Sequence, residues 1–191
     1  GHTRWATHGA PTTLNAHPHQ SGNVAVVHNG IIENFKELRT ELEAHGIGYK
    51  TDTDTETVAL LTQHYMSRGH SPREASELTV GRLEGSFALA FLFHGEDDLL
   101  IAARKGSPLA IGHGSGEVYI GSDAIALAPL TNKITYLEED DFAVLTRYSI
   151  KIWDKNGQLA KRSTRAIAID ATQVDKAGYK HFMAKEIAEQ P

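Results

Sequence analysis

Residues 23–34 read NVAVVHNGIIEN, and they contain the change of pattern that decides the fold. The run from Asn23 to His28 is short and rich in β-branched residues, which predicts a buried strand that stops at Asn29-Gly30. Apolar residues then recur at helical spacing, which predicts a helix over residues 32–45. A strand that ends beside an amide side chain and a glycine N–H offers both donor types of an oxyanion hole. The alternative interpretation is a tight turn made by the Asn-Gly pair.

Outward from this stretch, helices are predicted early in the chain and strands late. Helices are expected over 55–68, with a capping box of Thr53 and Glu56, and from Ser71, with Glu74. The apolar run FALAFLF at 87–93 predicts a strand covered on both faces. Further strands are expected over 99–103, 109–111, 118–120, 133–137, 142–145 and 149–153, with helices at 123–127 and 181–189 and a turn at 154–157. This order indicates a layered domain of helices and mainly antiparallel sheets.

Composition limits the class of protein. The chain has 191 residues and a net charge of -5 at pH 7, which predicts one domain and excludes a strongly basic nucleic-acid binder. No apolar run approaches the ~18 residues that suggest a membrane span. The first residues also lack the pattern of a signal peptide, so a cytoplasmic protein without membrane contact is expected. Cysteine is absent, which excludes disulfides and a cysteine nucleophile within this chain.

The first block of candidate site residues is HTRWATHG, residues 2–9. Arg4 carries a planar guanidinium that suits a carboxylate, and Thr7 adds a hydroxyl three residues later. Trp5 is a large aromatic residue in a polar segment and could cover a site. The alternatives are a surface salt bridge for Arg4 and ordinary packing for Trp5.

A second candidate is Asp54, in the block TDTDTE at residues 51–56. It comes just before a predicted helix, so it could cap the helix or favour its dipole. Its functional interpretation is a carboxylate that holds a substrate ammonium group. Asp52 and Glu56 compete for the same role.

Histidine is the unusual residue in the composition, with 11 copies. His2, His8, His17, His19 and His28 all fall in the first 28 residues. A zinc site needs three or four ligands in fixed geometry, and no HExxH motif or cysteine supports one here. Hydrogen-bonded loop histidines are therefore expected, with no metal and no cofactor. A histidine metal-binding module stays as a rival interpretation.

Several blocks, in this order and spacing, carry a family resemblance. HTRWATHG (2–9), NAHPH (15–19), HNGIIENF (28–35) and TDTDTE (51–56) together resemble the glutaminase domain of glutamine–fructose-6-phosphate amidotransferases. The later segments AARKGSPLAIG (102–112), GSDAIAL (121–127) and KEIAEQP (185–191) agree. The resemblance covers residues 1–191. Its WATHG and NAHPH motifs favour this family over the phosphoribosyl-pyrophosphate amidotransferases and asparagine synthetases.

The resemblance implies a fold and roles for individual residues. It implies an α+β fold, a four-layer αββα sandwich like that of N-terminal-nucleophile hydrolases. Arg4, helped by Thr7, would hold the α-carboxylate of glutamine. Asp54 would hold the ammonium group. Asn29 and Gly30 would form the oxyanion hole.

Three more residues are implied to contribute to the site. Trp5 would lie on a mobile loop and help to gate an ammonia channel. His17 matches a loop histidine near the substrate, and His8 is placed among the substrate-binding residues. The implied partners are L-glutamine and, through a sugar isomerase domain absent from this chain, fructose 6-phosphate. The full enzyme is expected to be a homo-oligomer.

One departure from the family pattern matters most. The family nucleophile is a cysteine at the mature N-terminus, and this chain has no cysteine. The chain is therefore expected to be a fragment truncated at the N-terminus, inactive by itself, with an unpaired sheet edge that favours association. The rival is a non-catalytic glutamine-binding domain that kept the pocket and lost the chemistry.

Overall fold

The structure, a computed structural model, describes residues 2 and 8–167 of the chain. The helix expected at 181–189 lies outside them. The helices are α1 (Phe35–Ala44), α2 (Asp54–Ser67), α3 (Pro72–Val80) and α4 (Ala124–Leu127). The strands are β1 (His19–Ser21), β2 (Val24–Ile32), β3 (Gly85–Phe93), β4 (Leu100–Lys105), β5 (Ala110–His113), β6 (Val118–Gly121), β7 (Lys133–Tyr136), β8 (Phe142–Thr146), β9 (Ser149–Trp153), β10 (Leu159–Ala160) and β11 (Thr164–Ala166).

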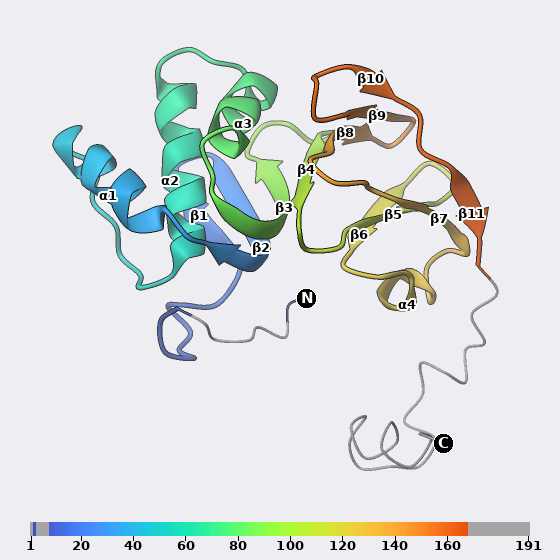
Figure 1. Cartoon of the computed structure of the whole chain (residues 1–191), viewed down its shortest axis with the longest axis horizontal. Coiled ribbons are helices and arrows are strands. Elements are labelled where there is room, and N and C mark those ends of the chain that lie inside the picture. Colours follow the sequence, from blue (N-terminus) through green and yellow to red (C-terminus); the bar gives the residue numbers. More distant parts are fainter. Residues whose placement is uncertain (1, 3–7, 168–191) are drawn as a thin grey trace, which may run out of the picture.

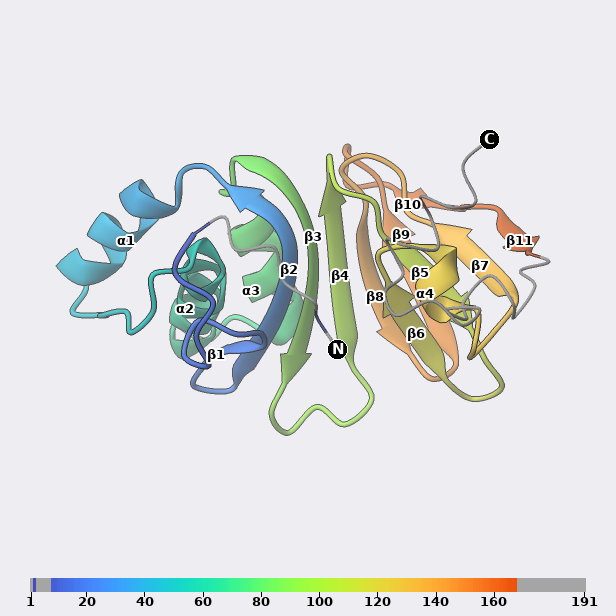
Figure 2. The same ribbon diagram turned by 90° about the horizontal axis from the view of Figure 1, so that it is seen from below.

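The strands form two sheets. The larger has the order β1-β2-β3-β4-β8-β9-β10 and the smaller the order β11-β7-β5-β6. Within the described residues every strand pair is antiparallel. Figures 1 and 2 show α1, α2 and α3 together beside the β1–β3 part of the large sheet, and the small sheet beside its other end. This arrangement excludes a doubly wound parallel sheet, the outcome that would have contradicted the predicted fold.

Separate apolar clusters divide the domain into four layers. The first cluster packs α1 and α2 against the large sheet and contains Leu61 and Phe91. The second lies between the two sheets, where Ala102 of β4 and Ile111 of β5 are fully buried. The third joins the small sheet to α4 through Leu127 and Ile134. The order helices, sheet, sheet, helix confirms the α+β sandwich that the resemblance implied.

The strand predicted to run from Asn23 to His28 is longer in the structure. β2 does not stop at Asn29-Gly30 but continues to Ile32, and both residues pair with β3, opposite Ala88 and Phe87. The prediction was wrong because an Asn-Gly pair is a local turn signal, whereas a nine-residue partner strand extends the ladder across it. Consequently α1 begins at residue 35, three residues later than expected.

The two predicted capping boxes had different outcomes. At α3 the box is confirmed, since the Ser71 side chain accepts from the Glu74 N–H and the Glu74 carboxylate accepts from the Ser71 N–H. At α2 it is wrong, because the N-cap Thr53 makes no side-chain capping bond. Its intended partner Glu56 instead accepts hydrogen bonds from Lys50 and Thr51, before the helix begins.

The later strands lie within one or two residues of their predicted ends, and the turn at 154–157 joins β9 to β10. The prediction that FALAFLF is covered on both faces holds at Ala88 and Leu89, which point to opposite faces and are both buried. It is wrong at Leu92, which is 56% exposed, while neighbouring Phe91 is fully buried. The cluster between the sheets contains Ala88 of β3 and residues of β4, β8 and β9, and Leu92 lies outside it.

The difference in burial between Phe91 and Leu92 can be tested on the 191-residue chain. Phe91→Ala should lower the free energy of unfolding by about 3–5 kcal/mol, because it leaves a cavity in the core between helices and sheet. Leu92→Ala is the matched control and should change it by no more than about 0.5 kcal/mol. Urea denaturation followed by circular dichroism measures both. Equal losses would show that Leu92 is buried in solution.

Candidate functional site

Asn29 and Gly30 lie in the middle of the fold, on β2. Alternate residues of a strand face opposite sides of the sheet. His28 is buried on the side of α2, where its Nδ1 lies 3.0 Å from Thr55 Oγ1. Asn29 is exposed and therefore faces the other side, together with the partly exposed Val27 and Ile31. The cluster between the sheets reaches Ala88, the β3 partner of Asn29, but Asn29 itself is exposed within the described part of the chain. Its amide is therefore accessible to a ligand there.

Gly30 occupies a position that only glycine fits. Its φ is +131°, a backbone conformation that side chains disfavour. A Cβ added there would lie 2.1 Å from the carbonyl oxygen of Ser86 on β3. The glycine therefore allows β2 to approach β3 closely at the residue next to the Asn29 amide.

Asp54 is the first residue of α2, and the fold ties it to the end of β2. Its Oδ2 accepts a hydrogen bond from the Ile32 N–H (2.8 Å) and its Oδ1 accepts one from the Thr55 N–H (3.0 Å). The residue is only 4% exposed, and His28 Nδ1 lies 3.9 Å from Oδ2. A carboxylate at a helix N-terminus is favoured by the helix dipole. A carboxylate can accept about four hydrogen bonds, and within the described residues two N–H groups donate to this one.

The structure separates Asp54 from its two competitors. The Glu56 carboxylate is buried and takes up the N–H groups of Lys50 and Thr51, at 2.7 to 3.1 Å, together with the Thr51 hydroxyl. Asp52 is exposed, and its N–H donates to Asn15 Oδ1. Glu56 is thus committed to the backbone, and Asp52 points its side chain away from the interior that contains Asp54.

The early histidines gather at one place on the structure. His2 and His17 stack with ring centroids 4.0 Å apart, and His17 meets His19 edge-on at 5.1 Å. His17 Nε2 lies 3.4 Å from Thr55 Oγ1, which is the hydroxyl that contacts His28. The structure therefore places His17 beside the N-terminal turn of α2, next to Asp54. The His8 ring meets the Phe35 ring edge-on, with centroids 5.0 Å apart.

Three predicted site residues, Arg4, Trp5 and Thr7, lie outside the described residues. His2, in the same block, donates a hydrogen bond from Nε2 to the His28 carbonyl oxygen at 2.9 Å, which requires the tautomer that carries its proton on Nε2. That bond connects the HTRWATHG block to β2 at the residue before Asn29.

His28 lies beside Asp54, whereas the sequence pattern singled it out only as one of the early histidines, with no role in a glutamine site. Its pKa is lowered to about 4, chiefly because burial penalises the charged imidazolium, and the Asp54 carboxylate opposes this only in part. Its Nε2 is buried without a hydrogen-bond partner among the described residues. The sequence signal was its position in the block HNGIIENF, one residue before Asn29, which points it to the opposite face.

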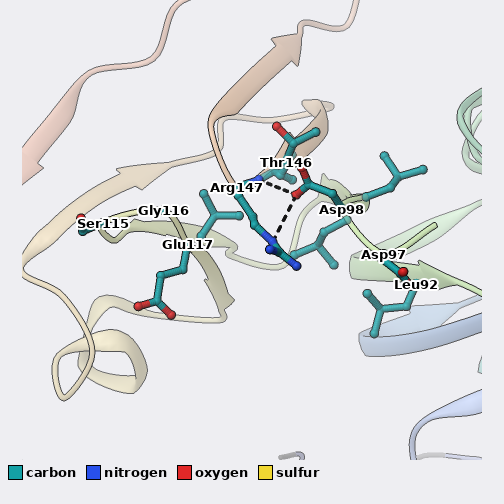
Figure 3. Close-up of a pocket in the computed structure, with 12 residues that line it drawn as sticks. Leu92, Asp97, Asp98, Ser115, Gly116, Glu117, Thr146 and Arg147 are labelled. Carbon is teal, nitrogen blue, oxygen red and sulfur yellow. Dashed lines mark hydrogen bonds and ion pairs between the residues drawn. The ribbon is translucent and has the colours of Figure 1, made fainter.

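The described residues contain no group of three histidine, aspartate or glutamate side chains arranged to hold a metal ion. None of the helices in that part of the chain is long and apolar enough to cross a bilayer. A cavity of about 470 Å³ opens at the turns of the β3–β4, β5–β6 and β8–β9 hairpins, where Asp98 accepts a hydrogen bond from the Arg147 N–H (Figure 3). None of the described candidate site residues lines it.

Comparison with known families decides the assignment. Residues 5–129 match the model of a glutamine amidotransferase domain. This chain belongs to that family. The match spans β2, the N-terminus of α2 and most of the large sheet, and so includes Asn29, Gly30 and Asp54.

Individual relatives agree with this assignment. The chain is 63% identical over 191 residues to a glutamine–fructose-6-phosphate aminotransferase (isomerizing) of Bradyrhizobium diazoefficiens, and it covers 31% of that protein. It is 53% identical over 191 residues to the enzyme of the same name from Gluconobacter oxydans, again covering 31% of it. The chain thus spans about a third of the length of these curated relatives.

Solved structures confirm the fold. The glutamine phosphoribosylpyrophosphate amidotransferase of B. subtilis, complexed with ADP and GMP, is similar with a TM-score of 0.64 and 26% identity, over 80% of this chain and 34% of that one. A structure described as the allosteric regulatory enzyme of purine biosynthesis has a TM-score of 0.60 and 25% identity, over 74% of this chain and 31% of that one. The amidotransferase domain described above therefore has the sandwich fold of these enzymes.

The close approach at Gly30 can be tested by adding a methyl group. Gly30→Ala should lower the free energy of unfolding by about 1–3 kcal/mol more than Gly46→Ala, because only at residue 30 does the new Cβ meet backbone. Gly46 is the matched control, since its φ is also positive, at +76°, but nothing lies within 4 Å of its added Cβ. Chemical denaturation of both variants measures the difference. Equal losses would contradict the close packing of β2 against β3.

The lowered pKa of His28 makes a pH-dependent contribution to stability. An unfolded histidine binds a proton below about pH 6.5, whereas folded His28 does so only below about pH 4. Stability should therefore fall as the pH drops through this window, by about 3 kcal/mol in total, and stay level above it. His28→Gln should remove this component, and the exposed His94→Gln is the control. Denaturation midpoints between pH 4 and 8 measure it, and identical profiles for wild type and His28→Gln would contradict the burial of a neutral His28.

Proposed function

We propose that this domain binds L-glutamine and promotes hydrolysis of its side-chain amide to glutamate and ammonia. The observation that carries the proposal is the placement of Asn29 on the accessible face of β2, with Asp54 anchored to the end of the same strand. Asn29 and Gly30 supply donors for the oxyanion that forms on the amide carbon. Asp54 supplies the acceptor for the α-ammonium group.

Both groups belong to the same end of β2. Asn29 and Ile32, whose N–H binds Asp54, are three residues apart on that strand. An extended glutamine has its amide at one end and its ammonium group at the other. We propose that a glutamine bound here places its amide near Asn29 and its ammonium group toward Asp54. Because Asn29 faces away from α2 and Asp54 is buried on the α2 side of the sheet, a local rearrangement must admit the ammonium group.

A glutamine zwitterion also needs a cation for its carboxylate. We assign this role to Arg4, with Thr7 as a further donor, since a guanidinium binds a carboxylate through two parallel hydrogen bonds. His2, two residues earlier, is already bound to β2 through the His28 carbonyl. Trp5, His8 and His17 complete the proposed glutamine site, with Trp5 as the cover that retains ammonia.

The acceptor of the ammonia is proposed from the relatives' names. The relatives above are glutamine–fructose-6-phosphate aminotransferases. We propose that the protein to which this domain belongs likewise transfers the amide nitrogen to fructose 6-phosphate, giving glucosamine 6-phosphate. The isomerase part and the homo-oligomeric assembly that this reaction implies stay predictions.

A second candidate function is a glutamine-binding domain without catalysis. These 191 residues contain no cysteine, so attack on the amide by a thiolate is impossible with the residues of this chain alone. We propose that the 191 residues by themselves bind glutamine without hydrolysing it. Glutamate release at enzyme-like rates by the isolated chain would contradict this and direct attention to Thr3 or Thr7 as a nucleophile.

Steady-state glutaminase kinetics in the complete natural protein tests the residue assignments. Arg4→Ala and Asp54→Asn should raise the KM for glutamine, since each removes one partner of a desolvated charge pair, a loss of about 2–5 kcal/mol. Their effect on kcat should be smaller, because both contacts exist in ground state and transition state. Asn29→Ala should instead lower kcat by about 10²–10³, since its donor matters most when the oxyanion forms.

Asp52→Asn is the matched control for Asp54→Asn, because Asp52 is exposed two residues away. It should leave both kinetic constants nearly unchanged. An unchanged KM for glutamine in Arg4→Ala would contradict the carboxylate-binding role and favour the alternative interpretation of Arg4 as part of a surface salt bridge. A complete protein that binds glutamine but releases no ammonia would favour the second candidate function.

A further inference from the structure

A buried ion pair lies behind the loop that leads to Asp54. Arg39 of α1 and Glu56 of α2 are 7% and 4% exposed, and Arg39 Nη2 is 3.7 Å from Glu56 Oε2. Burying two charges is costly unless their remaining hydrogen-bonding groups are satisfied. Here both side chains form hydrogen bonds with the backbone of residues 50–53, a segment without helix or strand structure.

The two charged side chains bind opposite kinds of backbone group in that segment: Arg39 binds carbonyl oxygens and Glu56 binds N–H groups. Arg39 Nη2 donates to the carbonyl oxygens of Thr51 (3.1 Å) and Thr53 (2.6 Å). Glu56 accepts from the N–H groups of Lys50 and Thr51, at 2.9 and 2.7 Å. Carbonyls and amides of one short segment are thus fixed from both sides. The segment ends at the first residue of α2, which is Asp54.

The guanidinium itself is held in one orientation. Its Nε donates to Thr57 Oγ1 at 2.9 Å, and its Cζ lies 4.0 Å from the centre of the Tyr49 ring. A planar guanidinium between a hydroxyl, two carbonyls and an aromatic face cannot be replaced by the single point charge of a lysine. Its position therefore fixes where the Thr53 carbonyl lies and, through the next peptide, where the Asp54 carboxylate points.

We propose that Arg39 and Glu56 form a positioning pair that sets the Asp54 carboxylate for the α-ammonium group of glutamine. This inference rests on the proposed function. It assigns to Arg39 no contact with substrate. It predicts that loss of the guanidinium geometry weakens the ammonium contact and spares the oxyanion hole, because Asn29 is held by β2 and β3 and not by α1.

The test compares two amides in the complete natural protein. Glutaramate is glutamine without its α-amino group, so it cannot use Asp54. Arg39→Lys should raise the KM for glutamine by about 10- to 100-fold, with kcat changed by less than about threefold. It should leave kcat/KM for glutaramate within about twofold of wild type. Combined with Asp54→Asn, it should cause no further loss, since both changes remove the same contact.

Controls separate positioning from folding. Arg82→Met breaks another ion pair of the helical layer, with Glu41 at 2.6 Å on the surface, and should alter neither substrate. Tyr49→Leu removes the ring beneath the guanidinium at a residue that is 45% exposed, so the fold tolerates it. It should raise the glutamine KM about two- to fivefold without affecting glutaramate, and it decides the question if Arg39→Lys does not fold.

The outcomes distinguish the two proposals. Equal losses for glutamine and glutaramate in Arg39→Lys, or losses additive with Asp54→Asn, would overturn the positioning role. If Asp54→Asn itself did not discriminate between the two amides, the ammonium site of the proposed function would be wrong. Asp54→Asn could weaken the use of glutamine alone, while Arg39→Lys and Tyr49→Leu affect glutamine and glutaramate equally. In that case only the positioning inference would fail.

Discussion

The pairing of β2 with β3 is the constraint on which the rest of the molecule depends. Nine residue pairs join the two strands, from Val24 opposite Phe93 to Ile32 opposite Gly85. At one end the backbones approach so closely that a Cβ on Gly30 would lie 2.1 Å from the Ser86 carbonyl, and one on Gly85 would lie 2.3 Å from the Ile31 carbonyl. Since a strand's side chains alternate between faces, this register turns Asn29 toward the accessible side and His28 toward α2. A slip of one residue would exchange the two and remove the site.

The helical layer supplies what the sheet cannot. Residues 50–53 have no ladder of their own, so their amides and carbonyls are satisfied by buried side chains from α1 and α2. Asn15 extends the same network, because its Oδ1 accepts from the Asp52 N–H and its Nδ2 donates to the Ala10 carbonyl. The NAHPH block, the TDTDTE block and α1 are therefore parts of one hydrogen-bonded support for the start of α2.

Local signals in the sequence predicted what local interactions determine. The Ser71–Glu74 capping box was correct because both partners belong to one helical turn and face solvent. The same pattern at Thr53 and Glu56 failed because a distant residue, Arg39, draws the loop carbonyls away and leaves Glu56 to bind the amides before it. Asn29-Gly30 failed as a strand end for a similar reason, since the length of β3 outweighs a two-residue turn signal. Asp54 could be predicted as a candidate, but its burial and its bond to Ile32 depend on contacts between segments far apart in sequence.

The burial of His28 makes chemical sense beside Asp54. A protonated imidazole 3.9 Å from the Asp54 carboxylate would pair with it and compete with any ligand cation. Burial lowers the pKa of His28 to about 4, so the ring is neutral at neutral pH. A neutral ring can still contact the Thr55 hydroxyl through Nδ1 and fill the space between β2 and α2. An aliphatic residue would fill that space without reaching the hydroxyl, and a lysine would neutralise the carboxylate. A buried neutral histidine therefore supports the turn that carries Asp54 while leaving its charge to the ammonium group proposed to bind there.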